Sequence, residues 1–345
     1  MEDTVLDAAP APASNCSKAT DCLTDVVVIG GGALGAATAW WLAGAGRPVI
    51  LIEETTGRQL RLAVRGTAWS AHPGWLADPE RPELDEASRA WRELERQTGV
   101  DLLTARDAVE HGAVFGPSAA GTWLDPEAAA KRWPGTAFTG PVLLRRDAAL
   151  QVRADHAVAA LTAGAIARGV VVRYRSPVTS VEALDDSHVE VRTAGGRVRA
   201  RRAIVTTLAT PASRGVELHF RPRIDPGDLP LLAHHDPELG LVRAAPCACG
   251  HLAIGARSSP RGTLGDLRDQ ARTWWPGLDA ERPEPVGPAA MTTMPAEITV
   301  RQRGPIVSAS STALGSIVTI AQGRRLAHQV LAGAPLDAAS WRAAR

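Results

Sequence analysis

Three glycines near the amino-terminal end of the chain have the spacing of a dinucleotide site. Gly30, Gly32 and Gly35 form a G-x-G-x-x-G pattern directly after an apolar run. The first glycine allows a tight turn, the second lets a pyrophosphate approach the backbone, and the third lets a helix pack closely on its strand. A helix that starts at Ala33 and Leu34 would offer free N–H groups and a partial positive charge to the phosphates.

An acidic residue follows where such a site requires one. Glu53, with Glu54 beside it, ends a second apolar run. A carboxylate there accepts hydrogen bonds from the ribose of an adenosine. A glycine triplet alone would also fit a glycine-rich turn in another α/β protein, but strand, triplet, helix, strand and terminal acid together favour the dinucleotide site. We assign its residues to cofactor binding: Gly30, Gly32, Ala33, Leu34, Gly35, Glu53 and Glu54.

Two strands and a helix must position these residues. Residues 26–29 are too few and too β-branched for a helix, so they predict a buried strand. About ten residues of helical pattern follow the glycines, and residues 49–52 form the second strand.

The rest of the chain alternates predicted strands and helices, with residues 208–290 largely irregular and rich in proline. The predicted helices are 84–98, 126–133, 153–168, 266–274 and 323–331. The predicted strands are 113–115, 142–150, 170–175, 178–183, 189–192, 198–207, 240–244, 251–256, 298–300 and 317–320.

Composition narrows the class of protein. The 345 residues are 45% hydrophobic and 22% charged, which suits two globular lobes, and the net charge of +1 points neither to nucleic acid nor to an anionic membrane. No apolar run approaches the ~20 residues of a membrane span. The first 24 residues lack the pattern of a secretory signal and predict a disordered tail. Only Lys18 and Lys131 are lysines, so a catalytic lysine has almost no candidates.

The cysteines and histidines do not predict a metal site. Cys16 and Cys22 lie in the expected tail, and Cys247 and Cys249 form a C-x-C pair. Zinc sites usually combine C-x-x-C pairs or histidines at metal spacing, which are absent here. We therefore expect free thiols in a reducing cytoplasm, and a solvated loop at residues 234–236, where two histidines precede an aspartate.

The order of these segments resembles the D-amino-acid-oxidase-like branch of the FAD amine oxidoreductases, and within it the monomeric sarcosine oxidase and N-methyltryptophan oxidase group. The similar stretches are the nucleotide unit, WRELERQTGVDLLT (91–104), AVFG (113–116), KRWPG (131–135), the helix from Arg153 and VTSVE (178–182). The resemblance is specific over the first 210 residues and faint afterwards.

The resemblance implies a mixed α/β fold with two domains. A doubly wound Rossmann-type FAD domain would comprise residues 25–83, 150–212 and 288–345. A substrate domain with an antiparallel sheet would comprise residues 84–149 and 213–287. FAD would bind extended, with its adenosine on Glu53 and its adenine against the backbone near Val178.

The family's chemistry is the loss of a hydride from the carbon beside an amine to flavin N5, which needs positioning more than protein side chains. GRQLRLA (57–63) resembles the family's arginine pair, so Arg58 is assigned to the flavin and Arg61 to the substrate carboxylate. A surface ion pair is the alternative role of these arginines. In LGSIVT (314–319), Gly315 is assigned to the cofactor, and Ile317 stands where the family has a carboxylate-binding lysine.

Several other positions depart from the family pattern. Ala253 replaces the oxygen-activating lysine, Arg257 replaces a histidine, and Ala290 replaces the cysteine that tethers the flavin. The loop before residue 57 is shorter by around ten residues, and Leu208-Ala209-Thr210 replaces a Gly-Ala-Trp turn. His251 lies two residues from Ala253, on the same face of its expected strand. His251 and Arg257 are therefore catalytic candidates, although a structural role suits His251 as well.

These departures imply a noncovalent flavin, slow reduction of oxygen and a more apolar pocket. Three hypotheses remain. The chain is an FAD-dependent oxidoreductase that acts on an amine or amino-acid-like substrate in specialised metabolism, or a non-redox enzyme (cyclisation, elimination or isomerisation) whose flavin is structural or lost, or a noncatalytic subunit of a larger enzyme. The sequence does not choose the oligomeric state.

Overall fold

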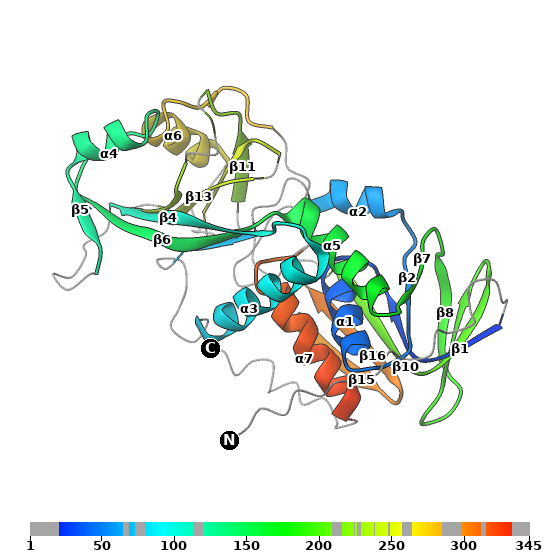
Figure 1. The fold of residues 1–345 in the computed structure, drawn as a ribbon. Helices are drawn as coiled ribbons and strands as arrows, with labels where there is room; N and C mark the ends of the chain where they lie inside the picture. Colours follow the sequence, from blue (N-terminus) through cyan, green and yellow to red (C-terminus); the bar gives the residue numbers. More distant parts are fainter. Residues whose placement is uncertain are drawn as a thin grey trace, which may run out of the picture.

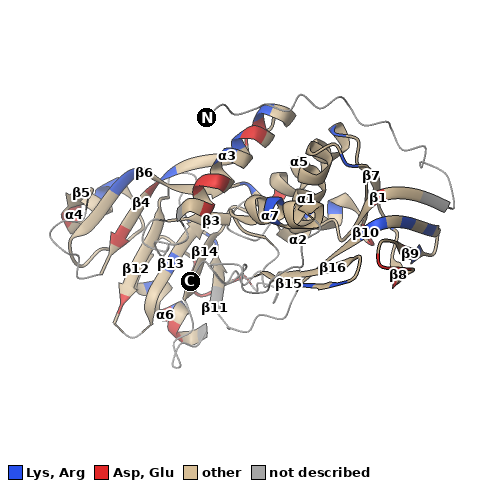
Figure 2. Cartoon of the chain, turned by 90° about the horizontal axis from the view of Figure 1, so that it is seen from below, with Lys and Arg blue, Asp and Glu red and all other residues tan. Residues whose placement is uncertain are grey.

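The computed structural model describes residues 21–64, 69–72, 81–112, 120–208, 216–223, 225, 229–237, 239–247, 249–256, 264–284, 298–311 and 315–332. Two eight-stranded sheets organise these residues (Figure 1). No helix among them is both long and apolar enough to cross a membrane. The colours of the ribbon in Figure 2 show basic and acidic residues in both halves of the molecule, in keeping with the net charge of +1.

The first sheet has the strand order β15-β16-β10-β1-β2-β7, and the hairpin of β8 and β9 is attached to β10. β1, β2, β7, β10 and β16 run parallel, while β15 is antiparallel to β16. The strands are β1 (Asp21–Ile29), β2 (Val49–Ile52), β7 (Val171–Arg173), β8 (Val178–Ala183), β9 (Val189–Thr193), β10 (Gly196–Leu208), β15 (Ile298–Arg303) and β16 (Ile306–Ser311).

Both faces of this sheet are covered, and so its central strands read as unbroken apolar runs. Val26 and Val28 face a core shared with four helices, whereas Val27 faces the β8–β9 hairpin. The helices are α1 (Ala33–Gly44), α3 (Arg81–Thr98), α5 (Ala154–Ala167) and α7 (Thr319–Ala332), which lie together in Figure 1. A further helix, α2 (Gly57–Val64), follows β2.

The second sheet has the order β11-β14-β13-β12-β4-β6-β3, with β5 paired to β6. Among the described residues, the strand pairs of this sheet are antiparallel except β4 with β12. The strands are β3 (Trp69–Ala71), β4 (Leu103–His111), β5 (Thr122–Leu124), β6 (Val142–Val152), β11 (Val216–Phe220), β12 (Leu231–Asp236), β13 (Gly240–Pro246) and β14 (Leu252–Ala256). One face packs on α4 (Pro126–Arg132) and α6 (Leu264–Trp274) through a second hydrophobic core.

The mixed α/β fold is confirmed, and three local predictions are wrong. β1 begins at Asp21 and pairs with β10 from there, so residues 21–24 are not part of a tail. Residues 317–320 form a turn and the start of α7 rather than a strand, because the Ser316 N–H donates to Thr319 Oγ1 and closes a helical turn. His234 lies in β12, where strand pairing buries it, instead of in a solvated loop.

The expectation of free thiols is wrong for Cys247 and Cys249, which form a disulfide. The turn between β13 and β14 explains the bond. The Gly250 N–H donates to the Cys247 carbonyl, and the Cys247 N–H donates to the His251 carbonyl. These bonds hold the two cysteine Cα atoms 5.3 Å apart, within the usual span of a disulfide.

Candidate cofactor and substrate sites

The glycines after β1 form a tight junction between β1, α1 and β10, which we call the glycine corner (Gly30–Gly35, Glu53 and Thr206). Gly30 has φ +99°, in the region that glycine adopts without strain. A Cβ on Gly30 would meet the Oγ1 and carbonyl oxygen of Thr206, and one on Gly35 would meet the carbonyl oxygen of Gly30. The backbones can approach each other only because both side chains are absent.

The middle glycine has a different environment. A Cβ on Gly32 would meet no atom within 4 Å, so the space over the start of α1 is open. Gly32 is the N-cap residue, no side chain caps the helix, and its first turn holds no acidic residue. The helix therefore presents uncapped N–H groups and the positive end of its dipole to this space, which is a natural anion site.

Glu53 closes the corner from β2. One oxygen of its buried carboxylate accepts from the Gly31 N–H at 2.6 Å. The other accepts from the backbone N–H and the hydroxyl of Thr55, at 2.7 and 2.6 Å. An ionised carboxylate has about four acceptor positions, so one remains for a further hydroxyl. Glu53 thus fixes the glycine loop and keeps capacity for a ligand.

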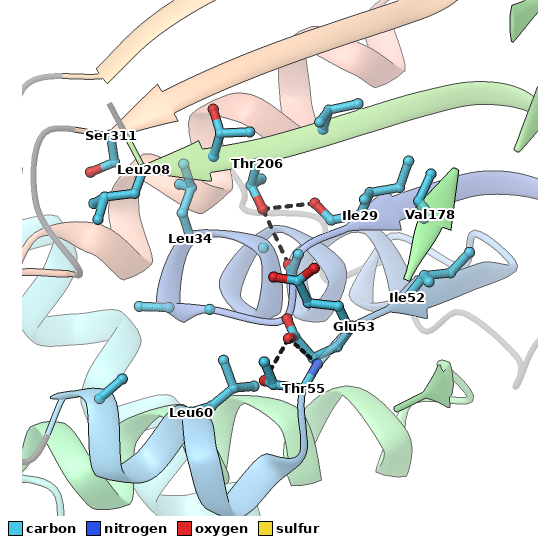
Figure 3. Close-up of a pocket in the computed structure, with 18 of the residues that line it drawn as sticks. Ile29, Leu34, Ile52, Glu53, Thr55, Leu60, Val178, Thr206, Leu208 and Ser311 are labelled. Carbon is cyan, nitrogen blue, oxygen red and sulfur yellow. Dashed lines mark hydrogen bonds between the residues drawn. The ribbon is translucent and has the colours of Figure 1, made fainter. Parts of the chain in front are cut away.

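These residues line a cavity of about 680 Å³ (Figure 3). It lies at the carboxyl ends of β1, β2 and β10, over the start of α1, with the side of α2 along another wall. In an open parallel sheet, ligands bind at this end of the strands. Figure 3 shows Glu53 and Thr55 at the centre of the cavity and Val178 on its rim. The Thr206 hydroxyl braces the loop by donating to the carbonyl oxygens of Ile29 and Gly30.

The second sheet offers a separate group of polar side chains. Directly opposed residues of neighbouring strands point to one face of a sheet. On β4, β12 and β13, the face opposite α4 and α6 carries Glu110, Ala233 and Arg243 in one row. We call this side the polar face. Arg145 on β6 reaches Glu110 in an ion pair.

A buried histidine lies beside the polar face. The ring of His72, which follows β3, places Nε2 3.1 Å from the carbonyl oxygen of Val109. The pKa of His72 is lowered to about 3, chiefly by burial and further by the charges of Arg145, His235 and Arg243, against the Val109 hydrogen bond, which raises it. His72 is therefore neutral at physiological pH, next to a region whose charge is positive.

Ala253 and His251 approach the polar face from β14. Ala253 pairs with Ala245 on one side and with His219 on the other, so these side chains share the polar face. His251 precedes β14, with Nδ1 3.2 Å from Cys249 Sγ and Nε2 3.1 Å from a carboxylate oxygen of Glu284.

The amino-acid sequence matches the family model described as FAD dependent oxidoreductase (DAO) over residues 25–311. The chain belongs to this family. A glycine oxidase from Bacillus licheniformis is 24% identical over 290 residues, which cover 74% of this chain and 78% of that protein.

Solved structures share the fold. NikD, an amino acid oxidase essential for nikkomycin biosynthesis, matches with a TM-score of 0.66 at 17% identity and covers 92% of this chain and 96% of its own. L-amino acid deaminase from Proteus myxofaciens matches with a TM-score of 0.65 at 16% identity, covering 97% and 96%. Glycine oxidase from Geobacillus kaustophilus matches with 0.63 at 19% identity, covering 91% and 96%.

The glycine corner fits the adenosine diphosphate half of the family's FAD. The open space at Gly32 admits a pyrophosphate, the uncapped helix start favours its charge, and Glu53 has an acceptor position left for the ribose. All seven residues that the sequence assigned to this site gather there, and Val178 lines the same cavity. The sequence did not indicate Thr55 or Thr206. The sequence could have indicated Thr206 by its position near the end of the predicted strand 198–207, which lies parallel to β1 in the structure.

The assigned residues farther along the chain are less close to the cavity. Arg58 and Arg61 are exposed on α2, whose cavity side consists of Gln59, Leu60 and Ala63. Gly315 has φ +153° and lies against the ring of Trp69, outside the cavity lining.

Two further assignments concern Ile317 and Arg257. Ile317 is fully buried in the core of the helices and is not part of the lining of the glycine-corner cavity, and its carbonyl accepts from Trp91 Nε1. Arg257 and Ala290 lie outside the described residues.

Proposed function

We propose that this family member binds FAD noncovalently at the glycine corner and oxidises a C–N bond of an amine or amino acid, with the substrate carboxylate on the polar face. The observation that carries the proposal is the open, uncapped start of α1 beside Glu53. Bound FAD supplies the acceptor for a hydride from the carbon beside nitrogen. In this proposal the first sheet with its helices forms the FAD domain and the second sheet forms the substrate domain. The bounds differ from the sequence-based division, because α3 packs in the first core and β3 pairs in the second sheet.

The chain's own residues would hold the cofactor by its phosphates and ribose. The N–H groups at Ala33 and Leu34 face the open space and would bind the pyrophosphate. Glu53 would bind the ribose, and Val178 would contact the adenine. We infer noncovalent binding because Ala290 stands at the position of the cysteine that tethers the flavin in the sarcosine oxidase group, which the sequence resembles. The side chain of alanine has no nucleophile.

The names of similar proteins support an amino-acid or amine substrate. They include a glycine oxidase, an amino acid oxidase and an L-amino acid deaminase. A substrate of this class carries a carboxylate, which pairs well with a guanidinium. Arg243 stands on the polar face, where Ala233 on β12 lies between it and Glu110.

The positive charge near the polar face has a second use. An amine must lose a proton before its lone pair can assist the loss of a hydride from the neighbouring carbon. Nearby positive charge lowers the pKa of an amine, just as Arg145 and Arg243 help to lower the pKa of His72. The same arginines would therefore hold the carboxylate and favour the reactive, neutral amine.

We also propose that the electron acceptor is not oxygen. Ala253 stands at the position of the oxygen-activating lysine of the sarcosine oxidase group, which the sequence resembles, and its side chain is a buried methyl group. Without that cation, developing superoxide loses its electrostatic partner. The fold shared with NikD, which is essential for nikkomycin biosynthesis, supports a step in specialised metabolism.

Anaerobic reduction tests the proposal. The FAD-loaded protein is mixed without oxygen with glycine, sarcosine, proline and a panel of D- and L-amino acids, and bleaching of the flavin absorption is followed. At least one substrate should bleach it, and admission of oxygen should restore the colour slowly. Arg243→Ala should raise the apparent Kd of that substrate about 10- to 100-fold, the value of a lost charge-assisted hydrogen bond.

The matched control is Arg146→Ala, because Arg146 is an exposed arginine on β6 next to Arg145. It should leave the substrate Kd unchanged. A protein that retains FAD and converts an amine without any bleaching would contradict the redox proposal and favour the non-redox enzyme. An equal effect of the two arginine variants would contradict the placement of the carboxylate.

A further inference from the structure

The start of β14 brings together two cysteines and two histidines, which we call the cysteine corner (His219, Cys247, Cys249 and His251). Cys247 and Cys249 come from the turn between β13 and β14, and His219 comes from β11 on the other side of β14. His219 Nδ1 lies 4.0 Å from Cys247 Sγ, and His251 Nδ1 lies 3.2 Å from Cys249 Sγ. None of these residues belongs to the glycine corner.

The spacing of these atoms suits a tetrahedral metal ion. One nitrogen of His219 and the two sulfurs all lie within 4.8 Å of one another. Around zinc, with Zn–S of about 2.3 Å and Zn–N of about 2.0–2.1 Å, neighbouring sulfur and nitrogen ligands are about 3.6 Å apart. The two measured S···N distances lie on either side of that value. His251 lies outside this group of three, with Nδ1 3.2 Å from Cys249 Sγ, and a movement of its side chain would add the fourth donor.

The surroundings are those of a metal site as well. Metal-bound histidines usually donate their other ring N–H to a carboxylate or a carbonyl. His251 has this arrangement, with Nδ1 facing sulfur and Nε2 3.1 Å from Glu284. The Glu284 N–H in turn donates to the His219 carbonyl at 2.8 Å. His219 and Cys247 are buried, while Cys249 is partly exposed and Gly250 is exposed, which gives an ion a path in.

We propose that His219, Cys247, Cys249 and His251 bind one Zn²⁺ when the two cysteines are reduced. The disulfide form of the site binds no metal, because its sulfurs are not thiolates. Two electrons from a thiol or phosphine reductant, with two protons from the thiols or from water, convert the disulfide to two thiols, and the reductant becomes a disulfide or a phosphine oxide. Zinc then displaces the two thiol protons and forms two Zn–S bonds, with neutral imidazoles as the other ligands.

The proposed ion would tie three parts of the second sheet together. β11 is an edge strand, joined to the sheet through β14 alone in the described residues. A ligand from β11 and two from the β13–β14 turn would hold that edge in place. The sheet carries the polar face, so the oxidation state of the cysteines would control how firmly part of the substrate domain is held.

Cobalt titration of the full chain tests the proposal, since thiolate-bound tetrahedral Co²⁺ has characteristic charge-transfer and d–d bands. The phosphine-reduced protein should take up one Co²⁺ with these bands in difference spectra, and Zn²⁺ should displace it. The diamide-oxidised protein should show none. Cys249→Ser, at a partly exposed position, should abolish the bands, and Glu284→Gln should weaken Zn²⁺ binding about 10- to 100-fold.

The matched control is the Cys16→Ser/Cys22→Ser variant, which removes the chain's other two cysteines and should bind Co²⁺ like the unmodified protein. Circular dichroism of each variant establishes that it is folded. Absence of the thiolate bands in the reduced protein would overturn the proposal. Their persistence in folded Cys249→Ser, or their loss in the control variant, would overturn it too. FAD binding is measured independently in the same samples, so a failure of the zinc site is distinguishable from a failure of the proposed function.

Discussion

The glycine corner and the cysteine corner both lie at the end of a strand, yet they are built in opposite ways. The glycine corner, which includes Gly30 and Glu53, depends on glycines that have no side chain. The absence of these side chains lets the backbones approach each other and leaves a space over the start of α1. The cysteine corner uses side chains that are present, drawn from strands distant in the sequence. A local sequence motif thus forms a cavity that suits a large anionic ligand, whereas strand pairing brings together a small set of sulfur and nitrogen donor atoms.

The largest effect is expected from the glycine corner itself. Gly35→Ala would push a methyl group against the carbonyl oxygen of Gly30, a backbone atom that cannot move away. Overpacking of this kind should cost about 3 kcal/mol or more of unfolding free energy and abolish FAD binding. Urea unfolding and the flavin content of the purified protein measure both effects.

Gly32→Ala is the matched control for this change, because the same methyl group would enter open space at an ordinary φ of −63°. Its unfolding free energy should stay within about 0.5 kcal/mol, while FAD affinity falls at least ~10-fold. Equal destabilisation by the two substitutions would break the distinction between the packing glycine and the ligand glycine.

A second prediction concerns Glu53. Glu53→Gln removes the charge that accepts from the Gly31 and Thr55 N–H groups, and it removes the proposed ribose partner. Hydrogen bonds to a charged group contribute about 1.5–3 kcal/mol, so FAD should bind about 10- to 100-fold more weakly in fluorescence titration. Glu182→Gln, at an exposed position of β8 outside the cavity lining, should change the affinity less than threefold. The cysteine corner should bind cobalt normally in both variants.

The third prediction locates acid sensitivity in the second sheet. His111 and His234 stack in its core, with their Nδ1 atoms 3.0 Å apart. The Thr139 N–H donates to His111 Nε2, so His111 carries its proton on Nδ1 and donates it to His234. The pKa of each histidine is lowered to about 4, by burial for His111 and by burial together with the neighbouring His111 for His234.

Because these pKa values are below the unfolded value of about 6.5, the unfolded chain binds more protons and stability falls as the pH drops from 6.5 towards 4. Between pH 7 and 5 the pair should account for about 3–4 kcal/mol, measured by urea unfolding. A His111→Asn/His234→Asn variant should lose that part of the pH dependence. His188→Asn, at an exposed hairpin, should keep it. An unchanged pH dependence in the double variant would refute this location.

The smallest effect is expected at Thr206. Thr206→Val removes the hydroxyl that donates to Ile29 and Gly30 and should cost about 1 kcal/mol of unfolding free energy. Thr207→Val, one residue farther on and exposed, should cost almost nothing. If both variants unfold at the same urea concentration, Thr206 does not brace the glycine loop.

Features with a local periodicity were predictable from the sequence. The bounds of β2 and β8 match their predicted ranges, and Gly99, with φ +69°, ends α3 as expected. The glycine corner was predictable for the same reason, since its motif and its acid lie on one short stretch. The start of α7 was missed because the apolar run of residues 317–320 resembles a strand, and only the Ser316–Thr319 contact shows the helical turn.

Features that depend on strand register were not predictable in this way. The polar face exists because Glu110, Ala233 and Arg243 meet across three strands, which no spacing in the sequence encodes. Ligand spacings along the sequence do not indicate His219, because only the pairing of β11 with β14 brings His219 to Cys247. The exposure of Arg58 and Arg61 likewise depends on which side of α2 meets the cavity.

The measurement that tests the central claim most directly is the stoichiometry and reversibility of FAD binding. The purified chain is saturated with FAD, freed of excess by gel filtration and precipitated with acid. The account predicts one FAD per chain, with all the yellow colour in the supernatant. When Gly32→Ala is instead loaded at a low FAD concentration and then gel-filtered, the account predicts a colourless protein. A chain that stays colourless in excess FAD, or a flavin that remains in the precipitate, would contradict it.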